Sequence, residues 1–259
     1  MNNSVRMPDS IMGIATHSLE LALISAAVLG FRHGFDYDHI AAISDITSVQ
    51  TERSLGMRLG LLYALGHAAT VAVLGSAVIL FQLSLPEGMD RIAERLVGIT
   101  LLILGVYVMG SLFRGSSPPR SRFHIIAGAL RWLHWKLKSN WHDHEIQTPV
   151  RAGWNYNAKS VLMIGVIHGF GAETPSQLMI FLLAANLGGI GKGFLGLTMF
   201  IAGLLVMNTA MTAAATGLFG FGSGLPRFQY LVTALTAIYS LAVGTFFLFG
   251  SSGLLPPLG

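Results

Sequence analysis

Residues 31–40 read FRHGFDYDHI and stand at the end of an apolar stretch that is long enough to enter a lipid bilayer. Two histidines, His33 and His39, and two aspartates, Asp36 and Asp38, therefore fall at membrane depth. Ionisable side chains are costly there and usually mark a functional site. Imidazole and carboxylate groups also suit divalent transition metals where thiolates are lacking, and the chain has no cysteine. The stretch predicts a membrane protein that handles a transition-metal cation.

The composition is that of an all-α polytopic membrane protein. Hydrophobic residues make up 53% of the 259 residues and charged residues only 11%, and the mean hydropathy is +0.62. A spanning helix needs about 20 mostly apolar residues, and the long continuous apolar runs exclude the short alternating strands of a membrane β-barrel. Six transmembrane helices are expected, at about residues 19–43, 59–83, 92–112, 160–185, 194–218 and 228–249.

The basic residues predict how these helices are oriented. Most lysines and arginines fall in loops on one side of a six-helix topology, chiefly in the loop 114–158. The positive-inside rule then makes this loop cytoplasmic and places both termini outside. The sequence pI of about 9.6 follows from that bias, so no nucleic acid partner is expected. Residues 142–145 of the loop read HDHE, a pattern typical of transient metal capture or of an ordinary solvated loop.

A short motif occurs twice in the chain. Residues 33–35 read HGF, as do residues 168–170, and each copy stands on the first helix of a group of three. Polar residues also interrupt the second helix of each group, at His67 and at Asn208. An odd number of spans per half inverts the second copy, as in many secondary transporters whose sites lie where the halves meet. The pattern predicts a 3+3 inverted repeat, residues 1–113 and 159–259.

The first helix of each repeat is expected to be broken. Positions six residues apart differ by about 120° on an ideal helix, so His33 and His39 reach one ion only if the helix unwinds between them. Gly34 tolerates such a break. A helix end in water is the alternative, although residues 40–43 resume the apolar pattern. In the second half Pro175 removes a helical hydrogen bond, which favours either a break that lines a cavity or a plain kink.

The candidate ligands come from both halves. His33, Asp38 and His39 are the expected primary ligands, and His67 is a ligand from the second helix or a lone interhelical hydrogen-bonding residue. Carboxylates offset the cost of bringing a doubly charged ion to membrane depth. The second half is expected to supply the opposite wall of the site through His168, Glu173 and Asn208. Asn208 is either a neutral oxygen ligand or a residue that forms hydrogen bonds between helices. Residues expected to support the ligands or carry protons are Asp36, Thr70, Thr174 and Gln177.

Four stretches resemble the motifs of the nickel/cobalt transporter family. Residues 32–43, RHGFDYDHIAAI, are similar to its signature of histidine, four variable residues and aspartate-histidine. Residues 65–71, 168–174 and 202–209 resemble its second, third and fourth motifs. Gly171 and Asn208 stand where that family has aspartate. The resemblance implies that nickel or cobalt is transported. The best-known members of the family are usually drawn with eight helices, so the six expected here imply a six-helix branch of the wider nickel/cobalt permease superfamily. The residues alone leave zinc, copper and iron open.

The sequence as a whole predicts a secondary transporter in the cytoplasmic (inner) membrane, with the metal ion as substrate and no cofactor. No phosphate-binding Gly-x4-Gly-Lys-Ser/Thr motif is present, so the driving force must come from gradients or a separate partner. A potential near 100 mV supplies about 2.3 kcal/mol per charge, which favours uptake over efflux. A membrane-embedded accessory protein and a metalloenzyme are the alternatives, although no His-Glu-x-x-His motif supports an enzyme. A homo-oligomer and a metal-delivery partner are both compatible with the sequence.

Overall fold

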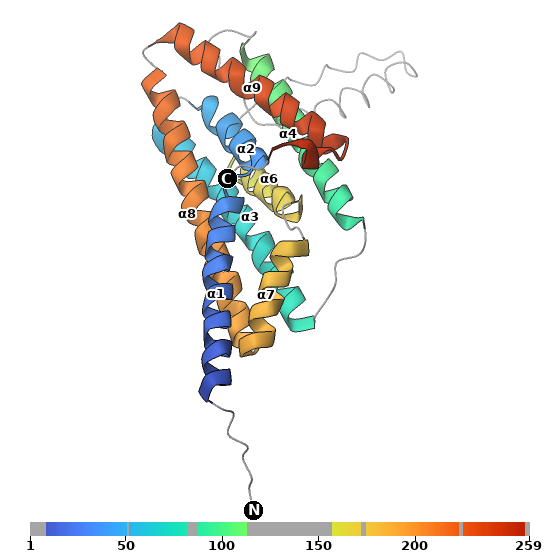
Figure 1. Cartoon of the computed structure of the whole chain (residues 1–259). Helices are drawn as coiled ribbons and strands as arrows, with labels where there is room; N and C mark the ends of the chain where they lie inside the picture. The colour runs from blue at the N-terminus through green and yellow to red at the C-terminus, as the bar shows by residue number, and fades with distance from the viewer. Residues whose placement is uncertain are drawn as a thin grey trace, which may run out of the picture.

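The computed structural model describes residues 9–50, 52–81, 88–112, 157–171, 175–222 and 225–256. These residues form eight α-helices and a short 3-10 helix, and no strand occurs among them. The all-α prediction is therefore confirmed (Figure 1). Most of the predicted loop 114–158 lies outside the described residues, as do Glu173 and Thr174. The helices are α1 (Asp9–His33), α2 (Tyr37–Ser48), α3 (Arg53–Phe81), α4 (Met89–Leu112), α6 (Ala158–Gly171), α7 (Pro175–Gly188), α8 (Ile190–Gly222), α9 (Pro226–Leu248) and η1 (Ser252–Leu254).

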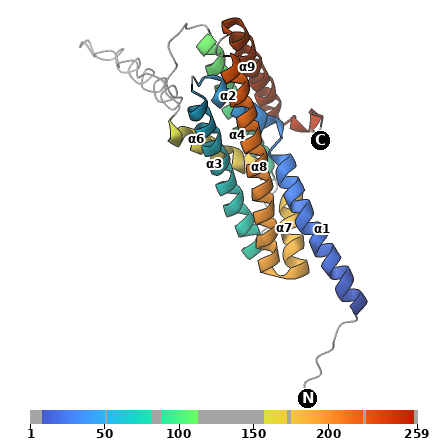
Figure 2. The same ribbon diagram turned by 90° about the vertical axis from the view of Figure 1, so that its left-hand side faces the viewer.

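The long helices are built to cross a bilayer. Four of them, α3, α4, α8 and α9, are long and apolar enough to span a membrane, and α6 is a shorter apolar helix. Many large apolar side chains point outward from the bundle, including Val73, Val106 and Leu235. Exposed apolar groups of this kind are expected where the surrounding medium is lipid. In both views of the ribbon, α1 runs beside α8 and α4 runs beside α9 (Figures 1 and 2).

The structure does not have six continuous helices, because two predicted segments are each divided into two helices. The first segment, 19–43, becomes α1 and α2, and the fourth, 160–185, becomes α6 and α7. Asp36 is the residue that breaks the first segment, with φ −69° and ψ 160° in the extended region. The backbone N–H groups of Phe35 and Asp36 donate to carbonyls three residues earlier and close a turn. The break lies between His33 and His39, where their spacing requires one.

Close helix crossings hold the two sequence halves together. A Cβ atom at Gly30 of α1 would overlap a backbone carbonyl of α8, and one at Gly165 of α6 would overlap a backbone carbonyl of α3. The partner helices also carry a glycine at each crossing, Gly203 on α8 and Gly66 on α3. Small residues allow such close backbone approach between membrane helices. The first helix of each half thus packs against the second helix of the other.

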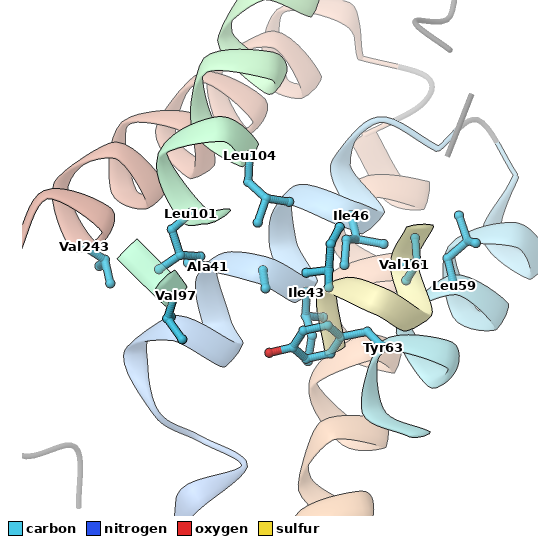
Figure 3. Packing of buried hydrophobic residues seen from close by; sticks show 12 residues of the cluster. Ala41, Ile43, Ile46, Leu59, Tyr63, Val97, Leu101, Leu104, Val161 and Val243 are labelled. Atoms are coloured by element: carbon cyan, nitrogen blue, oxygen red, sulfur yellow. The ribbon is translucent and has the colours of Figure 1, made fainter. Parts of the chain in front are cut away.

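The short helix α2 lies inside the protein. Nine of its twelve residues are buried, and it contacts α3, α4, α8 and α9. Figure 3 shows Ala41, Ile43 and Ile46 packed among apolar side chains of the surrounding helices, including Leu59 of α3 and Leu101 of α4. Irregular backbone and short helices are tolerated at membrane depth when protein surrounds them. This packing fixes the position of the polar residues at the start of α2.

Candidate metal site

Three histidines from three helices meet at the break between α1 and α2. His33 is the last residue of α1, His39 lies in the first turn of α2, and His67 lies in the middle of α3. Their exposed fractions are 3%, 0% and 0%. One nitrogen from each ring lies within 4.8 Å of the others, which is close enough for the three to hold one metal ion. The ring centroids of His39 and His67 are 4.5 Å apart, and those of His33 and His39 are 4.9 Å apart.

The distance between two of these nitrogens suits a shared ion. The Nε2 atoms of His33 and His67 are 3.2 Å apart. For an ion about 2.1 Å from each nitrogen, as in zinc–histidine sites, that separation corresponds to an N–metal–N angle of about 100°. This angle lies between the octahedral and tetrahedral values. The pair therefore needs little movement to coordinate a first-row divalent cation.

Two neighbours fix which nitrogen of each ring is available. The Nδ1 atom of His33 lies 2.8 Å from Oδ2 of Asp36, and a carboxylate accepts, so His33 carries its hydrogen on Nδ1. The Nδ1 atom of His39 lies 3.0 Å from Oδ1 of Asn208 and donates to it. Both Nε2 atoms therefore carry a lone pair, the form in which neutral imidazole binds metal. The lone pair of His33 accepts a hydrogen bond from Nε2–H of His67 over 3.2 Å, so His67 must move this hydrogen to Nδ1 when both nitrogens bind one ion. Asp36 and Asn208 orient the ligands without belonging to the three-histidine cluster.

Several polar atoms of the site are unsatisfied within the described part of the chain. Nε2 of His39, Nδ1 of His67 and Nδ2 of Asn208 are buried without a hydrogen-bond partner there. A buried unpaired polar group costs about 1–3 kcal/mol. Such groups persist in native proteins mainly for a functional reason. A ligand that binds at the cluster accounts for the lone pair at His39 Nε2.

Asp38 supplies negative charge beside the cluster. Its side chain is only 4% exposed, and its carboxylate interacts electrostatically with His33, His39 and His168. Neutral imidazoles bring no charge to balance a divalent cation, so a buried carboxylate lowers the cost of placing the ion at this depth. Asp38 thus interacts electrostatically with histidines of the cluster and with His168.

His168 does not join the three-histidine cluster. Its Nδ1 lies 3.0 Å from the hydroxyl of Tyr63, and its Nε2 lies 2.6 Å from Oγ1 of Thr100. The Tyr63 ring lies between the two regions, with its centroid 5.9 Å from that of His39 and 5.5 Å from that of His168. Both ring nitrogens of His168 are therefore engaged away from the cluster.

The sequence reasoning missed Tyr63 and Thr100. Tyr63 stands four residues before His67 and so shares its helix face, which was a usable signal. No signal in the sequence pointed to Thr100, because its contact with His168 depends on how α4 packs. The hydroxyl of Thr70 donates to the Val166 carbonyl, with an oxygen–oxygen distance of 3.1 Å, and joins α3 to α6. The side chain of Gln177 lies outside the described part of the chain.

Comparison with known proteins finds relatives that include metal transporters. The urease accessory protein UreH of Bacillus sp. (strain TB-90) is 26% identical over 86% of this chain and 88% of its own. The cobalt transport protein NhlF of Rhodococcus rhodochrous is 29% identical over 85% of this chain and 67% of its own. The nickel transporter NixA of Staphylococcus aureus is 25% identical over 85% of this chain and 70% of its own. This chain is a homologue of the nickel and cobalt transporters.

The similarity to NhlF and NixA covers 85% of this chain, and with its four long apolar helices it makes the chain a multi-pass membrane protein. No family model matches it. No solved structure matches it either. The three-histidine cluster consequently lies inside the membrane region of a transporter homologue.

Proposed function

We propose that this protein is a secondary transporter that moves Ni²⁺ or Co²⁺ across the cytoplasmic membrane, and that His33, His39 and His67 bind the ion. The convergence of these three buried side chains from α1, α2 and α3 carries the proposal. Imidazole nitrogen is a ligand that suits nickel and cobalt. The homology to nickel and cobalt transporters selects these two metals from the others that imidazole would bind.

The remaining polar residues take supporting roles in this proposal. Asp38 balances the charge of the ion, while Asp36 and Asn208 orient His33 and His39. Inside-negative membrane potential attracts a cation by about 2.3 kcal/mol per charge and 100 mV, so the proposed direction is uptake. The proposed orientation places the loop 114–158 in the cytoplasm and both termini outside. His168 and Glu173 belong to the second half and are proposed to line the path of the ion beyond Tyr63.

We also propose that the two halves are an inverted repeat, which the helix crossings support. Gly30 stands three residues before His33, as Gly165 does before His168, and each glycine packs against the second helix of the other half. Aromatic rings follow the same relation. Phe200 of α8 stacks on His33 with a centroid distance of 5.7 Å, as Tyr63 of α3 contacts His168.

The repeat explains why only one such site is proposed. Gly66 on α3 is followed by His67, whereas Gly203 on α8 is followed by Leu204. The second half therefore lacks the histidine that completes the cluster in the first half. A single ion site near the meeting point of the halves is the arrangement expected of such transporters.

An experiment with purified protein in liposomes tests the proposed function. The wild-type chain is expected to move Ni²⁺ or Co²⁺ into vesicles loaded with a metal-sensitive dye when the interior is negative, and His39→Ala is expected to abolish the flux. His17→Ala is the matched control, because this α1 histidine has an 82% exposed side chain. No flux of either metal through the wild-type chain would overturn the transporter proposal.

The same assay decides a second candidate function. UreH, a urease accessory protein, aligns with this chain over 88% of its own length, against 67% for NhlF. This fuller match favours a metal-binding accessory protein as the alternative. Binding of nickel in detergent without flux in liposomes would select it.

A further inference from the structure

A row of polar side chains leads away from the three-histidine site along α8. Asn208, Thr212 and Thr216 stand four residues apart, so they share one helix face. All three are buried. The Thr212 hydroxyl donates to the Asn208 carbonyl and the Thr216 hydroxyl donates to the Thr212 carbonyl, each over 2.7 Å. The row thus places hydroxyl, amide and carbonyl oxygens inside an otherwise apolar helix.

Glycines of α3 make room for this row. A Cβ atom at Gly60 would overlap the side chain of Thr212. A Cβ atom at Gly56 would lie 2.7 Å from Cγ2 of Thr216. The two threonine side chains therefore fill the space that the glycines leave between α3 and α8. This contact is tight, so an ion passes only when the two helices separate locally.

The row runs from the three-histidine site at one end to a cavity at the other. At one end Asn208 accepts the hydrogen bond from His39, and its buried amide nitrogen has no partner among the residues that the structure describes. At the other end Thr216 and Gly56 line a cavity of about 200 Å³. Most of its other lining residues are polar or charged, namely Thr47, Gln50, Glu52, Arg53 and Gln229, and Phe219 and Gly220 complete the wall.

The side of α2 that carries His39 continues with apolar residues, while the buried polar residues Asp45, Thr47 and Ser48 stand at other positions of the helix. Ile43 and Ile46 stand four and seven residues after His39 and share its side of the helix. Both are buried in the apolar core (Figure 3). A divalent cation that leaves the histidines in this direction meets oxygen atoms on α8 and hydrocarbon on the side of α2 that carries Ile43 and Ile46. Because the cost of an unsolvated ion is large, the α8 face is the favoured route.

We propose that Asn208, Thr212 and Thr216 line the route by which the metal ion passes between the three-histidine site and this cavity. The inference rests on the proposed transport function. Neutral oxygen atoms bind a borderline cation more weakly than imidazole does, and conduction requires contacts that are weak enough to release the ion. Each threonine supplies its hydroxyl when α3 moves away from α8.

A valine substitution separates this role from packing. Thr212→Val keeps the shape of the side chain against Gly60 and removes the hydroxyl. The expected result is a flux of Co²⁺ in liposomes about tenfold below wild type, equivalent to about 1.4 kcal/mol of barrier height, with Co²⁺ affinity in detergent unchanged. Thr212→Ser is expected to restore the flux. Thr198→Val is the control, because Thr198 makes the same hydrogen bond to a carbonyl four residues earlier on the exposed side of α8.

The outcomes distinguish this inference from the transport proposal itself. A Thr212→Val variant that transports at the wild-type rate would overturn the route, whereas a wild-type chain without flux would overturn the transport function. Cysteine labelling gives an independent measurement, since the natural chain has no cysteine. A charged methanethiosulfonate reagent is expected to modify Thr212→Cys during Co²⁺ transport and to leave Thr198→Cys unmodified. Protection of Thr212→Cys throughout transport would also contradict the route.

Discussion

Asn208 offers the sharpest test of how the histidines are prepared for metal binding. Its Oδ1 accepts a hydrogen bond from Nδ1 of His39 over 3.0 Å, which leaves the lone pair on Nε2 of His39, the nitrogen proposed to bind metal. Asn208→Leu keeps a similar side-chain size but leaves the buried Nδ1–H of His39 without this acceptor. Loss of a group that orients a ligand histidine typically lowers metal affinity 10- to 100-fold, or about 1.4–2.8 kcal/mol. We expect a decrease of this size for both Ni²⁺ and Co²⁺.

Asn208→Asp is the matched variant, and it is expected to retain or raise the metal affinity. A carboxylate at this position still accepts from Nδ1 of His39, and a hydrogen bond to a charged group is roughly twice as strong as a neutral one. It also adds a negative charge near a divalent ion, so the affinity is expected to equal or exceed that of the wild-type protein. General damage to the fold would lower the affinity in both variants, whereas loss of the oriented His39 lowers it only in the leucine variant.

Isothermal titration calorimetry of purified protein in detergent measures these affinities, with Co²⁺ absorption spectra to report the ligand field. His17→Ala serves as the control for removal of a histidine far from the cluster. Wild-type affinity in Asn208→Leu, with an unchanged Co²⁺ spectrum, would refute the role of Asn208 and the tautomer assigned to His39.

Three further predictions follow from the geometry. His67→Ala is expected to weaken Co²⁺ binding much more than His168→Ala, because both ring nitrogens of His168 are hydrogen-bonded to Tyr63 and Thr100. Equal losses of Co²⁺ affinity in calorimetry would place His168 in the site. Gly165→Ala is expected to destabilise the protein by about 1–3 kcal/mol, because the added methyl group overpacks the α3–α6 crossing. Gly110→Ala is the control and is expected to be neutral or slightly stabilising, since a Cβ atom there meets no neighbour. Thermal unfolding in detergent compares the two variants, and equal stability would contradict the close crossing. Asp36→Asn is expected to lower metal affinity less than His33→Ala, because the amide oxygen still accepts from Nδ1 of His33. Calorimetric titration of both variants compares the two losses of affinity. A larger loss in Asp36→Asn would make Asp36 a ligand.

Local patterns picked out the three histidines that the structure brings together. The helix break came from the spacing of His33 and His39 together with Gly34, because helical geometry alone prevents both rings from reaching one ion without it. His67 was predicted from its isolation in an apolar helix. In each case the deciding information lay within a few residues of the side chain concerned.

Longer-range packing determined what the sequence left open. Asn208 was a candidate ligand, but its contact with His39 depends on the register of α8 against α2. His168 was expected in the wall of the site supplied by the second half, and only the placement of Tyr63 and Thr100 shows what its ring nitrogens contact. The break within the segment 19–43 was predicted, but the count of six helices did not treat the two parts as separate helices. Side-chain contacts between helices far apart in the chain leave no periodic signal in a single sequence.

X-ray absorption spectroscopy of the nickel-loaded protein tests most directly whether the three histidines hold the transported ion. We expect three imidazole nitrogens at about 2.1 Å, the usual distance for such ligands, and a reduction to two in His67→Ala. A spectrum without imidazole scattering, or one that His67→Ala leaves unchanged, would contradict the site.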